Sequence, residues 1–355
     1  MYLTLPPKSS HDALRKGIPF ELSEIERQNM EEAFGELGKS FSLRAFKRNG
    51  LFDAQQPHVF QAIGKAFADS LTPNNLAYLQ YFIYNSAISP VVYLEGFPVG
   101  DVPKTPKSIS SRGKPHISEF ISVGLLALAD RSFKNLKIGN VVLREDDNLR
   151  PISGTEDTMF EPFHTHCDLA DFGVLYCLKG TNNVSSLIIT TDSLWQSLMN
   201  DPARDLLFTP LRYFGEDKDA VSLIRMQVNG RFALEFSPEF THNEDFLNAY
   251  IALVQRMVDE QNPDALQAAN LGMAITKNWL NAASLVSYKA GDVAIINQRS
   301  TVRGILIDGL HQPDVEDRYL LSTTTKFGDD IARTTPTMSI DHVKALLKCA
   351  STTQR

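Results

Sequence analysis

Apolar residues in the first third of the chain follow the spacing of helices that bury one face. Ser23-Glu24-Ile25-Glu26 has the form of a capping box, which predicts a helix running from there toward Leu37. A second helix is predicted after Pro57, and the residues on its inner side are Val59, Phe60, Ile63 and Phe67. Residues 117–129 return to the same helical spacing, whereas 76–86 suit either a helix or a buried strand.

Short β-branched and aromatic runs separated by turn residues dominate the chain beyond residue 139, and one similar run precedes them. The predicted strands are 91–94, 141–143, 173–178, 185–190, 221–228, 232–236, 285–288, 293–297 and 318–325. One long helix, about Asp245 to Asp259, interrupts the series. Many short strands with one inserted helix predict an α+β, mainly β fold with a jelly-roll core.

The chain has no sharp linker or internal repeat, so we expect one domain over residues 1–335. Within it, 1–135 is expected to be mostly a helical layer and 136–335 the jelly-roll core, with the inserted helix at 244–260. Residues 336–355 are expected to form a C-terminal tail.

Composition narrows the class of protein. The 355 residues are 43% hydrophobic and 22% charged, as in ordinary globular proteins, and the net charge of -7 argues against electrostatic binding to nucleic acid or a membrane surface. The first residues lack the apolar run of a signal peptide, and no window reaches the ~18 apolar residues of a membrane span. Three cysteines make no disulfide framework. We therefore expect a cytoplasmic protein, and its oligomeric state is not predicted.

The segment Phe163-His164-Thr165-His166-Cys167-Asp168 carries the clearest candidate chemistry. Alternate residues of a strand point to one face, so His164, His166 and Asp168 would project together. Imidazole and carboxylate are ligands of first-row metals, and the pattern predicts a mononuclear metal site. The alternative interpretation is a polar loop with two incidental histidines.

Two further segments contribute polar side chains. Residues 291–304 are interpreted as a turn, a buried strand and then a polar loop that contains Arg303. Arg318 opens the next predicted strand, where a guanidinium can make a bidentate pair with a carboxylate ligand. For a lone arginine, a surface salt bridge with Asp317 or Glu316 is the better explanation.

Five pieces of the chain, in order between about residues 91 and 325, resemble the clavaminate synthase-like group of iron(II)- and 2-oxoglutarate-dependent oxygenases, related to taurine dioxygenase. They are a strand with Gly-hydrophobic-Pro and Thr-Pro, a His-Thr-acid motif, a Cys-Leu-basic strand, a Gly-Asp…His-Gly segment, and an Asp-Arg-Trp-Leu motif. In this chain these are Val92–Pro98 with Pro103–Pro106, Phe163–His166, Tyr176–Lys179, Gly291–Gly304 and Asp317–Leu320.

The resemblance implies a double-stranded β-helix core in which two histidines and a carboxylate hold Fe(II) beside 2-oxoglutarate and O₂. Arg318 matches the arginine that binds the distal carboxylate of 2-oxoglutarate, and Ser186 falls near a threonine that supports it. The group hydroxylates or desaturates free amino acids and derived small metabolites, so the resemblance implies an oxidoreductase with a small-molecule substrate.

The chain departs from the group at two ligand positions. His166 stands where the motif has a carboxylate, and Arg303, which cannot bind a metal, stands where it has the distal histidine. In one arrangement, His166 and Asp168 supply the pair, with water or His311 as the third ligand. In another, His164, His166 and Asp168 all bind, which needs a curved backbone because alternate residues are ~6.6 Å apart.

A third arrangement has weakened or absent metal binding. The protein would then be a catalytically silent relative that binds a small anion through Arg303 and Arg318. A separate alternative is an enzyme with an altered metal site that uses its metal without 2-oxoglutarate. In each arrangement Arg303 is expected at the pocket wall, contacting Asp168 or an anionic substrate.

Overall fold

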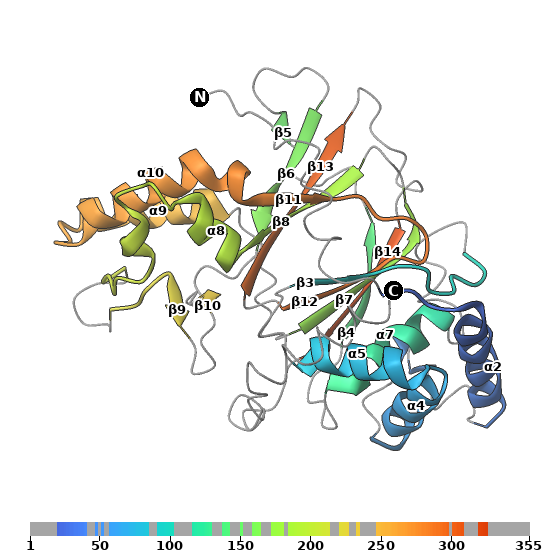
Figure 1. Ribbon diagram of the computed structural model, residues 1–355. Helices are drawn as coiled ribbons and strands as arrows, with labels where there is room; N and C mark the ends of the chain where they lie inside the picture. Colours follow the sequence, from blue (N-terminus) through green and yellow to red (C-terminus); the bar gives the residue numbers. More distant parts are fainter. Residues whose placement is uncertain are drawn as a thin grey trace, which may run out of the picture.

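The computed structural model describes the greater part of the chain (Figure 1). The described residues are 20–40, 47–48, 51–52, 57–84, 91–102, 116–129, 137–142, 150–151, 158–164, 172–180, 184–213, 220–226, 232–234, 246–297, 300–308 and 319–325. None of the helices described there is long and apolar enough to cross a membrane.

In the described part of the N-terminal layer the helices are α2 (Glu24–Ser40), α4 (Pro57–Asp69), α5 (Pro73–Tyr84) and α7 (Ile117–Ala129). The predicted capping box at the start of α2 is present, because Ser23 N donates to Glu26 Oε2 (2.9 Å) and Glu26 N donates to Ser23 Oγ (3.2 Å). The inner side predicted for α4 is buried, with Ile63 and Phe67 fully enclosed. The ambiguous segment is a helix, α5.

The sheet under these helices has five antiparallel strands in the order β3-β12-β7-β14-β4. Their bounds are β3 (Val91–Leu94), β12 (Val293–Asn297), β7 (Phe172–Lys179), β14 (Tyr319–Thr325) and β4 (Lys137–Val142). Strand β3 comes from the mostly helical part of the sequence and forms one edge, so distant segments of the chain complete the same sheet.

A second five-stranded antiparallel sheet has the order β11-β8-β13-β6-β5. Its strands are β11 (Ala283–Val286), β8 (Val184–Thr190), β13 (Thr301–Asp308), β6 (Thr158–His164) and β5 (Arg150–Pro151). On its outer side lie α8 (Thr191–Ser197), the 3-10 turn η2 (Arg204–Leu207), α9 (Phe246–Asp259) and α10 (Ala265–Ala282). Two small hairpins, β1 (Lys47–Arg48) with β2 (Leu51–Phe52) and β9 (Ile224–Met226) with β10 (Phe232–Leu234), complete the described elements.

Alternation along the strands divides the interior into three apolar clusters. Val174 and Tyr176 of β7 pack against the N-terminal helices, whereas Leu175 and Cys177 point to the other side. There they join Ile188 of β8 in the cluster between the two sheets. A third cluster lies between the second sheet and α8, α9 and α10. The order of layers is therefore helices, sheet, sheet, helices, which agrees with the expected mixture of helices and antiparallel sheet.

Two interpretations of the sequence were wrong. The polar loop expected after residue 297 is instead β13, a central strand that pairs with β8 on one side and β6 on the other. Its middle residues, Arg303 and Gly304, break the apolar alternation, but pairing on both edges holds the segment extended. The single long helix expected in the second half is followed by another, α10.

Candidate active site

The candidate site lies between the two sheets, and the register of the second sheet defines its wall. Ile188 of β8 belongs to the inter-sheet cluster, and its cross-strand partner on β13 is Arg303. Ser186 is two residues from Ile188, so it shares that face. Arg303 and Ser186 are therefore diagonal neighbours on the inner face, and such neighbours on adjacent strands have Cα atoms about 7–8 Å apart. Both are buried, with exposed fractions of 7% and 5%.

A β-bulge on β6 sets which residue stands opposite Arg303. Arg303 is paired with His164, but Ile305, two residues later, is paired with Glu161, three residues earlier on β6. The extra residue falls at Pro162-Phe163, and a bulge is where a proline that cannot donate to the ladder is found. A regular ladder would have placed Phe163 opposite Arg303. The bulge therefore places His164 at that register position.

Three of the five motif pieces meet at one corner of the first sheet. Gly291 N donates to Cys177 O (2.9 Å), Cys177 N donates to Asp292 O (2.8 Å), and Phe97 N donates to Gly291 O (3.0 Å). Gly291 has a φ of +88°, and a Cβ there would lie 2.6 Å from Phe97 O. Only glycine fits this turn, so the Gly-Asp part of the motif is structural.

Asp292 ties the same corner to the edge strand. Its carboxylate is buried and accepts hydrogen bonds from the Tyr93 hydroxyl and from Lys289 N. The Tyr93 ring lies 5.8 Å from the Tyr288 ring, beside the inter-sheet cluster. Tyr176 donates its hydroxyl to Pro98 O, and burial raises its pKa well above the usual range, so it stays neutral. These contacts fix β3, β7 and β12 against one another.

The predicted site residues are only partly covered by the description. The register of the second sheet places His164 opposite Arg303 and makes Ser186 a diagonal neighbour of Arg303, and the latter two residues are buried. His166, Asp168 and Arg318, and the alternative ligand His311, lie outside the described residues. Arg318 directly precedes β14, whose first residue, Tyr319, is paired with Lys179 of β7. The sequence did not predict the hydrogen bond between Tyr93 and Asp292, although both residues belong to segments that resemble the oxygenase motifs.

Iron binding depends on which donor side chains gather at the inner wall. Among them no three His, Cys, Asp or Glu side chains gather as a metal cluster, and His164 is the one expected ligand that the description includes. Its backbone stands opposite Arg303, a residue of the inner face, and imidazole is a residue type that binds Fe(II). The position opposite holds Arg303, whose guanidinium stays protonated and cannot replace an imidazole ligand.

Comparison with solved structures places the fold among those of non-haem iron oxygenases, which confirms the resemblance inferred from the motifs at the level of the fold. An asparagine oxygenase in complex with Fe(II), 3-hydroxyasparagine and succinate matches 85% of this chain and 92% of its own, with 15% identity and a TM-score of 0.54. The oxygenase OrfP with Fe and 2-oxoglutarate matches 86% and 93%, with 15% identity and a TM-score of 0.55. OrfP with Fe, succinate and dihydroxy-L-arginine matches 88% and 94%, with 17% identity and a TM-score of 0.57.

No family model matches the sequence, and no curated protein matches it. At this identity the likeness establishes the fold and leaves the activity to be inferred from the site.

Proposed function

We propose that this protein is a non-haem iron oxygenase that uses 2-oxoglutarate and O₂ to hydroxylate or desaturate a free amino acid or a derived small metabolite. The observation that carries the proposal is the pairing of His164 with Arg303 on the inner wall, next to the buried Ser186. The neighbours of this fold support it, because asparagine oxygenase and OrfP were solved with Fe and with succinate or 2-oxoglutarate. We also propose that the two sheets form a jelly roll.

In this proposal His164, His166 and Asp168 supply the ligands for Fe(II). Bound iron, with 2-oxoglutarate and O₂, would supply the oxidation of an unactivated C–H bond. Arg318 would hold the distal carboxylate of 2-oxoglutarate as a bidentate partner, and the Ser186 hydroxyl would donate to the same carboxylate. The apolar cluster between the sheets would keep bulk water from the reacting carbon.

Arg303 distinguishes this site, because it stands where the resembled oxygenases have the distal histidine ligand. A guanidinium in a buried position needs an anionic or strongly polar partner, because an unpaired buried charge is costly. Residues paired directly across an antiparallel ladder are near neighbours, so Arg303 stands beside the predicted metal position. We infer that Arg303 binds a carboxylate there, either the substrate's or that of Asp168. A free amino acid carries such a carboxylate, and OrfP was solved with L-arginine bound.

Cellular placement is also part of the proposal. Cys177 is a buried cysteine outside any disulfide, in the cluster between the sheets. A reducing cytoplasm, where Fe(II) and free thiols persist, suits such a protein.

The first experiment measures cofactor use. The protein is titrated with Fe(II) without oxygen, and succinate is then measured after 2-oxoglutarate and air are supplied. Iron binding with succinate release supports the proposal. Iron binding without succinate indicates a metal-dependent oxidase of another type. If neither the wild type nor His164→Ala binds iron, the oxygenase proposal is refuted and a small-anion-binding protein remains.

The second experiment separates the roles of the polar residues. Arg318→Ala removes a bidentate ion pair, so it should raise the 2-oxoglutarate concentration needed for half-maximal succinate release by at least tenfold. Ser186→Ala removes one hydrogen bond and should raise the same concentration by about fivefold. Arg303→Ala should instead lower coupling of succinate release to substrate oxidation across a panel of free amino acids. If Arg303→Ala weakens 2-oxoglutarate and Arg318→Ala does not, the assigned roles are reversed.

A further inference from the structure

The hairpin of α9 and α10 carries large apolar side chains on its outer surface, at the left of Figure 1. On α9, Ile251 and Val258 are 54% and 52% exposed; on α10, Leu266 and Met273 are 73% and 63% exposed. The members of each pair are seven residues apart, so they lie on one face of their helix. This is the spacing of helices that pack against further helices.

Both apolar pairs point away from the rest of the molecule. Leu266 is nine residues from the buried Ile275, about 180° around α10. On α9, Ile251 is two residues from the buried Leu253, about 160° around the helix. The side of α9 that faces α10 is marked by Tyr250, whose hydroxyl donates to Ala268 O at 3.0 Å. Both pairs therefore lie on the solvent-facing outer surface of the hairpin.

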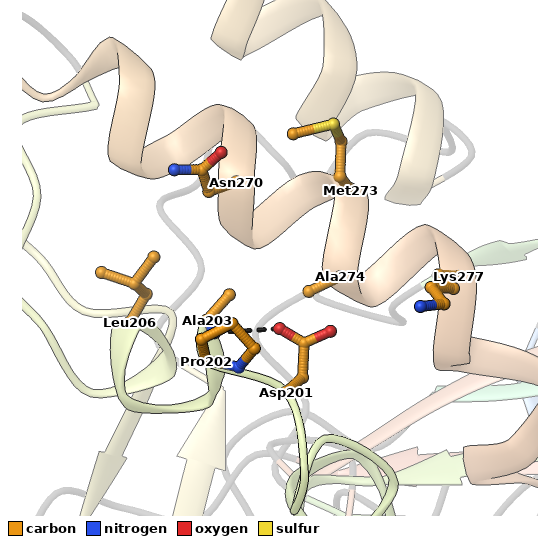
Figure 2. Close-up of a pocket in the computed structure, with 8 residues that line it drawn as sticks. All are labelled: Asp201, Pro202, Ala203, Leu206, Asn270, Met273, Ala274 and Lys277. Atoms are coloured by element: carbon orange, nitrogen blue, oxygen red, sulfur yellow. Dashed lines mark hydrogen bonds between the residues drawn. The ribbon is translucent and has the colours of Figure 1, made fainter.

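A hollow of about 410 Å³ lies at one end of this surface, between α10 and the segment before η2. Figure 2 shows Pro202 and Leu206 on one side of it, and Met273 with Ala274 of α10 on the other. Its lining is mainly apolar, with Asp201, Asn270 and Lys277 as the polar members, and its volume is large enough to receive an aliphatic side chain.

We propose that a second copy of this chain docks on the α9–α10 hairpin, with a two-fold axis beside Asn270. The two α10 helices then run antiparallel. Leu266 and Ala274 are each four residues from Asn270, about 6 Å along the helix. The axis therefore brings Leu266 of each copy to the hollow of the other, beside Met273. Asn270 meets Asn270 of the other copy, where two side-chain amides can exchange hydrogen bonds and fix the register.

Charge along the hairpin supports the antiparallel arrangement. Asp259 ends α9, and the turn that follows carries Glu260 and Asp264; among the described residues, Glu260 lies 4.0 Å from Arg256 of α9. Lys277 stands near the other end of α10, about 10 Å beyond Asn270. The two-fold axis places Lys277 of one copy near the acidic turn of the other, whereas a parallel arrangement would bring like charges together.

A second copy fits this surface better than an unrelated protein does. A two-fold interface must be complementary to itself, with every protruding group matched by a recess on the same surface. This hairpin has the protruding Leu266, the recess at Met273 and Ala274, and opposite charges at its two ends. The proposal is independent of the oxygenase activity.

Light scattering coupled to size-exclusion chromatography tests the proposal on the full chain. The wild type should be a dimer at tens of micromolar, and Leu266→Glu should raise the dissociation constant at least 100-fold, because the change removes the side chain from both hollows. Ile25→Glu is the matched control, because Ile25 is a 69% exposed apolar residue on α2, far from the hairpin in Figure 1. It should leave the dimer intact. A monomeric wild type, or a dimer that survives Leu266→Glu, overturns the proposal.

Cysteine crosslinking tests the position of the axis. Asn270→Cys should give a disulfide-linked dimer under mild oxidation, and Asn281→Cys, exposed near the far end of the same helix, should not. Wild-type protein gives the background from its own cysteines. Far-UV circular dichroism checks that each variant is folded. Equal crosslinking of the two variants refutes the proposed axis.

Discussion

Glu26 is expected to be worth several kilocalories per mole to the fold, although it lies far from the candidate site. Its carboxylate accepts hydrogen bonds from Ser23 N (2.9 Å), Thr72 N (2.7 Å) and Asn75 Nδ2 (2.9 and 3.0 Å to the two oxygens). It therefore joins the first turn of α2 to the start of α5 while only 2% exposed. Glu26→Gln keeps the shape of the side chain but removes its charge and places an amide group among these donors.

The magnitude follows from the pKa of Glu26. Burial by itself raises this pKa, but the hydrogen bonds from Thr72 and Ser23 outweigh it and lower the pKa from its ordinary value of 4.5 to about 2. A tenfold change in proton affinity is worth 1.36 kcal/mol, so the folded protein favours the charged carboxylate by about 3 kcal/mol. Glu26→Gln should therefore lower the free energy of unfolding at pH 7 by about 2–3 kcal/mol.

The pH dependence has a definite sign. A carboxylate with a depressed folded-state pKa stabilises the protein fully above its unfolded value of about 4.5, and that contribution is lost as pH falls toward 2. Urea unfolding at several pH values should therefore show the difference between wild type and Glu26→Gln shrinking between pH 5 and pH 2.

Glu24→Gln is the matched control for this experiment. Glu24 stands in the same turn, is 70% exposed and pairs with Arg27 at 3.1 Å, so its loss should cost less than about 0.5 kcal/mol. Equal losses in the two variants, or a difference that does not change with pH, would refute the reasoning about Glu26.

Two further predictions concern the corner that holds the first sheet. Gly291→Ala should lower the free energy of unfolding by about 2–4 kcal/mol, because position 291 has a positive φ and the new Cβ would clash with Phe97 O. Gly35→Ala is the control: Gly35 has open space around it in α2, so the change should raise the free energy of unfolding by up to about 1 kcal/mol. Thermal unfolding measures both variants. Asp292→Asn should cost about 1.5–3 kcal/mol, and a double-mutant cycle with Tyr93→Phe should show coupling of at least about 0.5 kcal/mol; additive effects would mean that the Tyr93 contact is unimportant.

Local signals in the sequence were enough for most of the helices and several strands. The capping box at Ser23, the helical spacing in α4 and the continuous apolar run of β12 each depend on neighbouring residues, and each element formed where it was predicted. Strand β13 was not predictable in the same way, because Arg303 and Gly304 interrupt its alternation and its pairing partners are more than 100 residues away. Helix α10 was missed although its alanine-rich sequence favours a helix.

Part of the candidate site was also predictable from the sequence. The resemblance to the oxygenase motifs assigned His164, Arg303 and Ser186 to one site. The bulge at Pro162-Phe163, which decides that position 164 and not 163 stands opposite Arg303, depends on a register between distant strands. No count of residues within the motif contains that information. The proposed coordination by His166 and Asp168 remains a prediction.

The extra residue in β6 lets two strands with different numbers of residues keep the same pairs. Between the pairs Glu161–Ile305 and His164–Arg303, β6 has two residues and β13 has one, so removing either Pro162 or Phe163 would leave a regular ladder with the histidine still opposite Arg303. Relatives of this chain should therefore tolerate one residue fewer at this point of β6, where the strand would lose only its local bend.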